Sequence, residues 1–262
     1  MLEMRQVYKT FNPGTVNEKK ALCGVDLKLE EGDFVTVIGS NGAGKSTALN
    51  AIAGAWPIDS GSIIIDGEDV TSLPEHKRAK YLGRVFQDPM TGTAATMEIQ
   101  ENMALAKRRG QRRTLRRGIT KQEREEFRDL LRTLNLGLED RMTARVGLLS
   151  GGQRQALTLL MATMQKPKLL LLDEHTAALD PKTAEKVLNA TDSIIQEHKL
   201  TAFMVTHNMR DAIVHGNRLI MMNEGKVIMD IRGEEKSRLT REELLDKFAS
   251  LSGGLSDRVL LS

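Results

Sequence analysis

The 262-residue sequence contains a single cysteine, Cys23, and aromatic residues make up only 3% of it. One cysteine cannot form an internal disulfide bond, and it rules out a zinc site built from several cysteines. The scarcity of aromatic side chains argues against a surface on which nucleic-acid bases stack. A formal net charge of +3 is too small to attract nucleic acid to the whole molecule. We therefore expect a protein of a reducing compartment, with no nucleic-acid partner.

The sequence also lacks a long apolar segment. No uninterrupted apolar run approaches the roughly 18 residues of a membrane-spanning helix, and residues 1–5 do not resemble the start of a secretory signal. Hydrophobic residues make up 40% and charged residues 28% of the chain, as in an ordinary globular protein. Any membrane association is therefore expected to depend on a partner protein.

The most informative feature that is present is a complete phosphate-binding loop of the pattern G-x-x-x-x-G-K-[ST]. Its nine residues are Gly39, Ser40, Asn41, Gly42, Ala43, Gly44, Lys45, Ser46 and Thr47. The loop lies between an apolar run that indicates a buried strand, residues 34–38, and a run that indicates a helix, residues 48–53. This context favours phosphate binding over a glycine-rich loop of another kind. We expect Lys45 to reach the β- and γ-phosphates of a nucleotide and the Ser46 hydroxyl to bind Mg²⁺.

Two acidic residues, Asp173 and Glu174, follow four consecutive leucines that predict a buried strand. Ligands of open α/β sheets bind at the carboxyl ends of the strands. Asp173 could hold Mg²⁺ directly or through water, and Glu174 could orient or deprotonate an attacking water. Taken alone, the pair would fit two solvated acids at a strand end equally well. The phosphate loop makes the catalytic interpretation the better one.

The segment Leu149–Gln153 predicts a second anion site. Ser150 could cap the helix that follows, and the two glycines, Gly151 and Gly152, would expose backbone amides at its start. This site would lie in an inserted helical region, away from the phosphate loop. Two phosphate sites in one chain suggest a head-to-tail dimer.

In this order, these motifs resemble those of the ATP-binding cassette (ABC) ATPases over about residues 2–232. The family's glutamine-ended strand, Ala-Leu-Asp loop and switch histidine correspond to Gln87, Ala178–Asp180 and His207. The resemblance implies an α/β fold, with a P-loop NTPase core of mixed sheet, an N-terminal antiparallel β region and an inserted α-helical subdomain.

The resemblance also implies a division of the chain. An ABC ATPase domain would cover residues 1–235. Within it, residues 1–87 and 164–235 would form the core with the β region, and residues 88–163 the helical signature subdomain. A C-terminal helix and tail would occupy residues 236–262.

The resemblance implies ATP and Mg²⁺ as cofactors, and it implies a role for each site residue. Phe11 would stack on adenine, although it could instead pack on the core. Gln87 would sense Mg²⁺ and water and would join Lys45 in the catalytic set. Glu174 is the candidate base, and His207 would contact the γ-phosphate. The γ-phosphate bound by one copy would meet the signature of the other, namely Ser150, Gly151, Gly152 and Gln153, with Asp180 at the dimer interface.

Three segments depart from the family pattern or fall outside it. His175 stands where proline is usual, either as a tolerated substitution or as a titratable group near the γ-phosphate. The basic stretch 107–117 is either a solvated face or a contact for anionic lipid or an acidic permease surface. Residues 251–254 imitate the signature without its glutamine, and we interpret them as a tail linker.

The resemblance implies the ATP-hydrolysing subunit of an ABC transporter, most simply an importer of a small solute such as an amino acid. An exporter ATPase, or a non-transport ABC ATPase acting on nucleic acid or the ribosome, are the alternatives. The expected partners are a second copy, an integral membrane permease and an extracytoplasmic substrate-binding protein. The subunit would sit at the cytoplasmic face of the membrane, held there by the permease.

Overall fold

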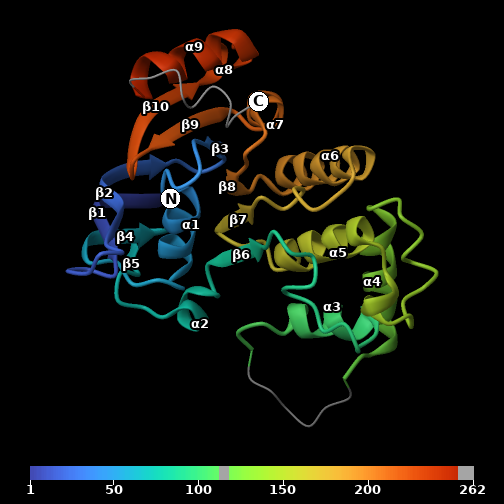
Figure 1. Ribbon diagram of the computed structural model, residues 1–262. Coiled ribbons are helices and arrows are strands. Elements are labelled where there is room, and N and C mark those ends of the chain that lie inside the picture. The colour runs from blue at the N-terminus through green and yellow to red at the C-terminus, as the bar shows by residue number, and fades with distance from the viewer. Residues whose placement is uncertain (112–117, 253–262) are drawn as a thin grey trace.

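The computed structural model describes residues 1–111 and 118–252, and it contains two sheets with helices packed around them (Figure 1). The first sheet is antiparallel, and its strand order is β2-β1-β4-β5. The bounds of these strands are β1 Leu2–Phe11, β2 Lys19–Leu29, β4 Ser60–Ile65 and β5 Glu68–Asp69. The antiparallel region predicted at the N-terminus is therefore confirmed.

The second sheet is mixed, and its strand order is β10-β9-β3-β8-β7-β6. All its neighbouring strands are parallel except β9 and β10, which form an antiparallel pair at one edge. Every residue of β3 and β8 is buried, as expected for central parallel strands covered on both faces. The bounds are β3 Phe34–Ile38, β6 Leu82–Val85, β7 Leu169–Asp173, β8 Thr201–Val205, β9 Arg218–Asn223 and β10 Lys226–Arg232.

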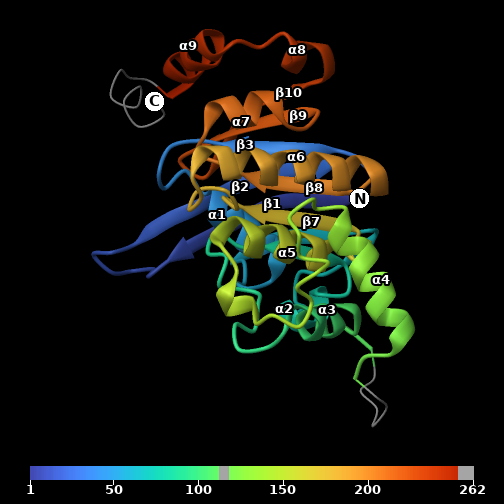
Figure 2. The same ribbon diagram turned by 90° about the vertical axis from the view of Figure 1, so that its right-hand side faces the viewer.

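The helices cover both faces of the mixed sheet. In Figures 1 and 2, α5 and α6 lie on one side of β7 and β8, while α1 lies on the side of the antiparallel sheet. The bounds are α1 Lys45–Ala53, α2 Glu75–Arg78, α3 Ile99–Lys107, α4 Lys121–Arg132, α5 Gly151–Thr163, α6 Pro181–His198, α7 Met209–Val214, α8 Gly233–Ser237 and α9 Arg241–Ser252. A 3-10 turn, Val146–Leu148, precedes α5.

The core divides according to the two faces of each strand. Leu169 and Leu171 of β7 pack in one cluster with α1 and the antiparallel sheet. Leu170 and Leu172, on the opposite face of the same strand, pack in a second cluster with α3, α4, α5 and α6. A third cluster joins α7 and α9 to β9. The inserted helices therefore share their core with the sheet, and the division of the chain at residues 88 and 163 remains a prediction.

Three details differ from the sequence-based expectation. The helix after the phosphate loop begins at Lys45. Strand β6 ends at Val85, so Gln87 lies two residues beyond the strand. The tail was expected to hold one helix, but α8 begins at Gly233 and precedes α9. Five residues are too few to produce a recognisable apolar period.

Across residues 1–111 and 118–252, no helix combines the length and the apolar composition that crossing a membrane requires.

Candidate nucleotide site

The phosphate loop connects the end of β3 to the first turn of α1, and its glycines are required by their surroundings. A Cβ atom on Gly39 would lie 2.1 Å from the backbone oxygen of Met222, and one on Gly44 would lie 2.5 Å from that of Ala21. Their φ values of 151° and 102° also disfavour any side chain. Gly44 caps α1 without a side-chain hydrogen bond, so the first amides of this helix remain available to an anion.

Lys45 lies inside this loop with only 6% of its surface exposed. Its Nζ atom donates hydrogen bonds to the backbone oxygens of Gly39, at 2.7 Å, and Ser40, at 3.1 Å. Burial lowers the pKa of the ammonium group, and the nearby charge of Glu174 opposes this effect. The charge of Glu174 therefore acts on Lys45, and the shared nucleotide site of the loop and the acidic pair stays a prediction.

The ends of β7 and β8 bring the acidic pair and the histidine together, because these strands are neighbours in the sheet. The Nδ1 atom of His207 lies 3.3 Å from Oε2 of Glu174. Glu174 has a φ of 43°, which is uncommon for a residue with a side chain, and its amide donates to the oxygen of Val205 at 3.0 Å. A strained backbone thus holds the candidate base beside the candidate switch histidine.

Asp173, the last residue of β7, is half-buried, and burial raises the pKa of its carboxyl. Arg84 of β6 opposes that shift, with Nη2 lying 3.8 Å from Oδ2 of Asp173. The same guanidinium group donates to the side-chain oxygen of Asn50 on α1 at 2.7 Å and stacks on Phe86. Sequence reasoning missed Arg84, since a single arginine on a short strand carries no motif.

The signature residues lie at the start of α5. Ser150 and Gln153 make a capping box, in which the Gln153 amide donates to the Ser150 hydroxyl at 3.3 Å and the Ser150 amide donates to the Gln153 side-chain oxygen at 3.2 Å. The Gln153 side chain also donates to the oxygen of Leu136. Within the described ranges, no hydrogen bond links this segment to the phosphate loop, and the second anion site stays a prediction.

Two further predicted residues, Phe11 and Gln87, lie outside the contacts described above. Phe11 ends β1, and its ring meets Trp56 edge-on with a centroid separation of 5.1 Å. Trp56 is 37% exposed and was overlooked in the sequence, although it is the only tryptophan and follows α1 closely. Gln87 is exposed on the segment that follows β6.

His175 points away from the nucleotide site. Its imidazole is buried, and Nε2 lies 3.1 Å from the hydroxyl of Thr191 on α6. Burial, and secondarily the neighbouring His215, lower the pKa of His175 to about 4. Of the two interpretations of this residue, the geometry favours a substitution accommodated in the core.

The described part of the basic stretch is largely engaged within the molecule. Lys107 pairs with Glu126, and Arg108 lies 2.9 Å from Glu123, both on α4. Residues 112–117 of the stretch, and residues 253–254 of the imitated signature, lie outside the described residues.

The sequence profile of the ABC transporter family matches residues 22–177 of the chain. The chain belongs to this family. A tyrosine transport ATP-binding protein of Clostridioides difficile is 43% identical to it over 253 residues, which cover 95% of the chain and 98% of the relative. A spermidine/putrescine import ATP-binding protein, PotA, of Haemophilus ducreyi is 35% identical over 230 residues, 88% of the chain but only 57% of the longer relative.

The solved structures agree with this assignment. A dimeric post-hydrolysis state of the ATP-binding cassette MJ0796, bound to ADP and phosphate, superimposes with a TM-score of 0.75 at 29% identity, covering 88% of the chain and 98% of the cassette. The cassette MJ1267 in its ADP conformation gives a TM-score of 0.77 at 25% identity, with 97% and 99% coverage. The chain is therefore an ATP-binding cassette that binds and hydrolyses ATP.

Proposed function

We propose that this chain drives the import of a small solute through a separate permease, with an aromatic amino acid as the substrate class. The observation that carries this proposal is the 43% identity to a tyrosine transport ATP-binding protein over almost the full length of both chains. The PotA relative is also named as an import protein, and this favours import over export. Lys45, Glu174 and His207 are all present at the site, so the chain has the groups that hydrolysis needs.

Mg²⁺ is part of the proposal, and the residues fit it. The Ser46 hydroxyl and the Asp173 carboxylate offer the oxygen ligands that this cation prefers, with Gln87 as a further amide oxygen. When bound, Mg²⁺ neutralises the charge of the phosphates. The Lys45 ammonium would bind the β- and γ-phosphates, Glu174 would accept a proton from the attacking water, and His207, which lies beside Glu174, would contact the γ-phosphate.

The signature would serve a second copy of the chain. Ser150, Gly151, Gly152 and Gln153 would bind the γ-phosphate of the nucleotide held by that copy, at the amides that begin α5. The support is that the capping box forms a regular start of α5, and that no described hydrogen bond joins this segment to the phosphate loop of its own chain. Asp180, which caps α6, would lie at the same interface.

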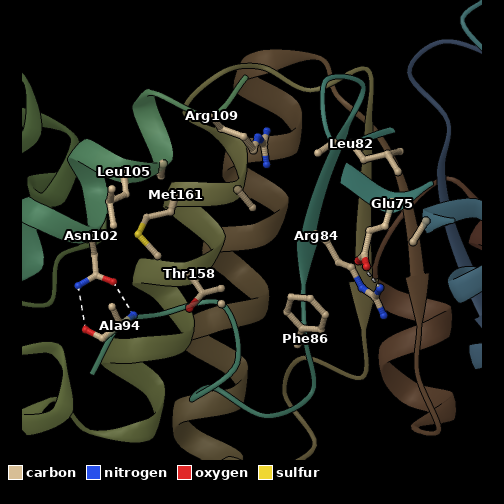
Figure 3. A pocket seen from close by; sticks show the side chains of 15 residues that line it. Glu75, Leu82, Arg84, Phe86, Ala94, Asn102, Leu105, Arg109, Thr158 and Met161 are labelled. Atoms are coloured by element: carbon tan, nitrogen blue, oxygen red, sulfur yellow. Dashed lines mark hydrogen bonds and ion pairs between the residues drawn. The ribbon is translucent and has the colours of Figure 1, made fainter. Parts of the chain in front are cut away.

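A groove of about 320 Å³ offers a docking site for the permease (Figure 3). Its walls are mainly apolar and come from β6, α3 and α5, including Leu82, Leu105 and Met161. Two arginines line it, Arg84 and Arg109, and the Nε atom of each is buried without a hydrogen-bond partner. A cytoplasmic helix of the permease with an apolar face and a carboxylate would fit both properties. The proposal includes a location at the membrane's inner face, held by the permease, and an extracytoplasmic substrate-binding protein as a further partner.

The test is uptake by cells that lack this chain. We expect deletion to abolish uptake of labelled tyrosine, the wild-type chain to restore it, and the Glu174→Gln chain, expressed at the same level, to restore none. Putrescine uptake in the same cells is the control for substrate class. Unchanged tyrosine uptake after deletion would contradict the proposed substrate class. Loss of putrescine uptake alone would instead indicate a polyamine as the substrate.

A further inference from the structure

The second glycine of the signature, Gly152, lies so close to α6 that no residue with a side chain would fit in its place. A Cβ atom at Gly152 would lie 2.0 Å from Cγ2 of Thr183, whereas one at Gly151 would lie 3.3 Å from the end of the flexible Leu179 side chain. Neither glycine has a positive φ, so the helical backbone itself does not require glycine here. At Gly152 the methyl group of Thr183 excludes a side chain.

Thr183 is held firmly in the first turn of α6. Its amide donates to Oδ1 of Asp180 at 3.1 Å, and Pro181 restrains the first residue of the helix. In a helix the branched side chain of threonine is limited to two common rotamers, so its methyl group has few other positions to take. The contact therefore sets a minimum distance between the beginnings of α5 and α6.

We propose that Thr183 is a positioning residue for the signature. Its methyl group, seated on Gly152, fixes the start of α5 relative to α6 and so sets where Ser150 and the exposed amides meet the nucleotide of a second copy. Because Asp180 caps the same turn of α6, the signature and the Ala178–Asp180 loop are held as one unit. The inference rests on the proposed two-copy site.

The experiment is carried out in Glu174→Gln protein, and ATP-driven dimerisation is measured by analytical ultracentrifugation. It compares Gly152→Ala with the same change combined with Thr183→Ser or with Thr183→Val. Gly152→Ala must push α5 away from Thr183, and we expect about a hundredfold weaker dimerisation, the scale known for misplacing a reacting group by about 1 Å. Adding Thr183→Ser removes Cγ2, which leaves the closest Thr183 atom, Cβ, 3.5 Å from the new methyl group. Dimerisation should return to within about tenfold of the Gly152 protein.

Thr183→Val is the matched control, because valine keeps the methyl group and replaces only the hydroxyl with a second methyl group. Gly152→Ala with Thr183→Val should remain as weak as Gly152→Ala alone. Equal dimerisation of the serine and valine double variants, or no effect of Gly152→Ala, would overturn the inference. Should Gly152→Ala fail to fold, Thr183→Ser alone should weaken dimerisation severalfold and Thr183→Val should not, and equal affinities would overturn the inference. A Glu174→Gln protein that stays monomeric in ATP would instead contradict the two-copy site.

Discussion

The buried imidazole of His175 lies in a small polar cluster between the end of β7 and α6. Its Nε2 atom is 3.1 Å from the Thr191 hydroxyl, which itself donates to the backbone oxygen of Val187. The next residue, Asp192, lies 2.7 Å from Nδ1 of His215. His175 is only 2% exposed, so a positive charge on it would be desolvated. The neutral imidazole is therefore the form that the folded protein accommodates.

This burial predicts a defined loss of stability in acid. The pKa of His175 is about 4 in the folded protein, against an ordinary histidine pKa of 6.5. Between pH 6.5 and 4 this histidine binds a proton in the unfolded chain but not in the folded one. Its contribution to the free energy of unfolding is therefore complete above pH 6.5 and is lost as the pH falls towards 4. The difference corresponds to roughly 3 kcal/mol.

His175→Gln should therefore flatten the dependence of the unfolding midpoint on pH between 6.5 and 4, as measured by thermal denaturation. His76→Gln, at an exposed position, is the control and should leave the slope unchanged. An equally steep slope in His175→Gln would show that other groups cause the acid sensitivity.

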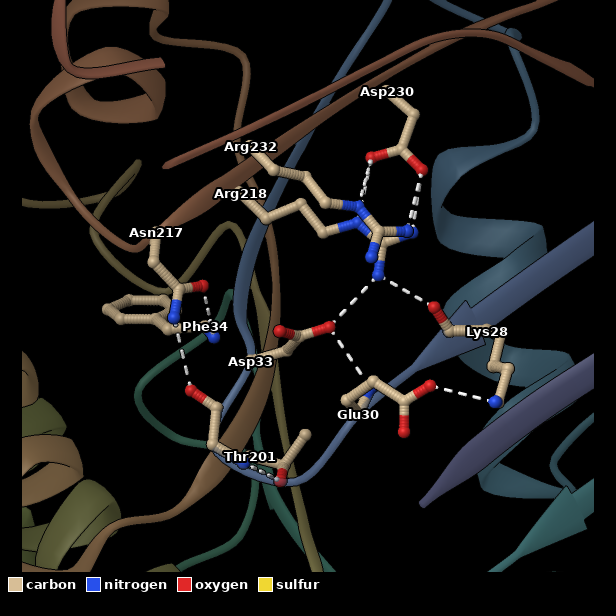
Figure 4. A network of polar contacts seen from close by, with 10 residues as sticks. Lys28, Glu30, Asp33, Phe34, Thr201, Asn217, Arg218, Asp230 and Arg232 are labelled. Carbon is tan, nitrogen blue, oxygen red and sulfur yellow. Dashed lines mark hydrogen bonds and ion pairs between the residues drawn. The ribbon is translucent and has the colours of Figure 1, made fainter. Parts of the chain in front are cut away.

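At the scale of elements, Arg218 joins the two sheets near the edge formed by β9 and β10 (Figure 4). The side chain is 2% exposed and makes two hydrogen bonds of 2.7 Å to Asp230 of β10. It also donates to Asp33, before β3, at 3.0 Å and to the backbone oxygen of Lys28 on β2 at 2.6 Å. Burial alone would raise the pKa of Asp230, but the hydrogen bonds from Arg218 and Arg232 outweigh it, and the pKa is lowered.

Removing Arg218 should be costly because it leaves Asp230 and Asp33 without their buried partner. We expect Arg218→Met to lower the free energy of unfolding by about 3–5 kcal/mol, measured by urea denaturation. Arg232 is the matched control, since it pairs with the same Asp230 but is 53% exposed. Arg232→Met should cost no more than about 1 kcal/mol. Similar costs for both variants would contradict the role assigned to Arg218.

At the scale of the whole molecule, the sequence predicted those strands and site residues that a local sequence pattern marks. The strand at residues 34–38 was expected at its observed bounds because a central parallel strand is a continuous apolar run. Glu174 and His207 were each named as site residues from the sequence, but the contact of 3.3 Å between them was not predicted. Arg84 and Thr183 could not be predicted in the same way. Their importance comes from contacts with Asp173 and Gly152, which only packing between distant segments creates.

The central claim is that a working nucleotide site combines the phosphate loop of one copy with the signature of another. The most direct test is the mass of the Glu174→Gln protein in saturating ATP and Mg²⁺, measured by light scattering after gel filtration. The control is a double variant that carries Ser150→Arg in addition to Glu174→Gln. We predict twice the 29.1 kDa of one copy for the first protein, and a single copy for the control and for either protein without nucleotide. A Glu174→Gln protein that binds ATP and remains at 29.1 kDa would contradict the account.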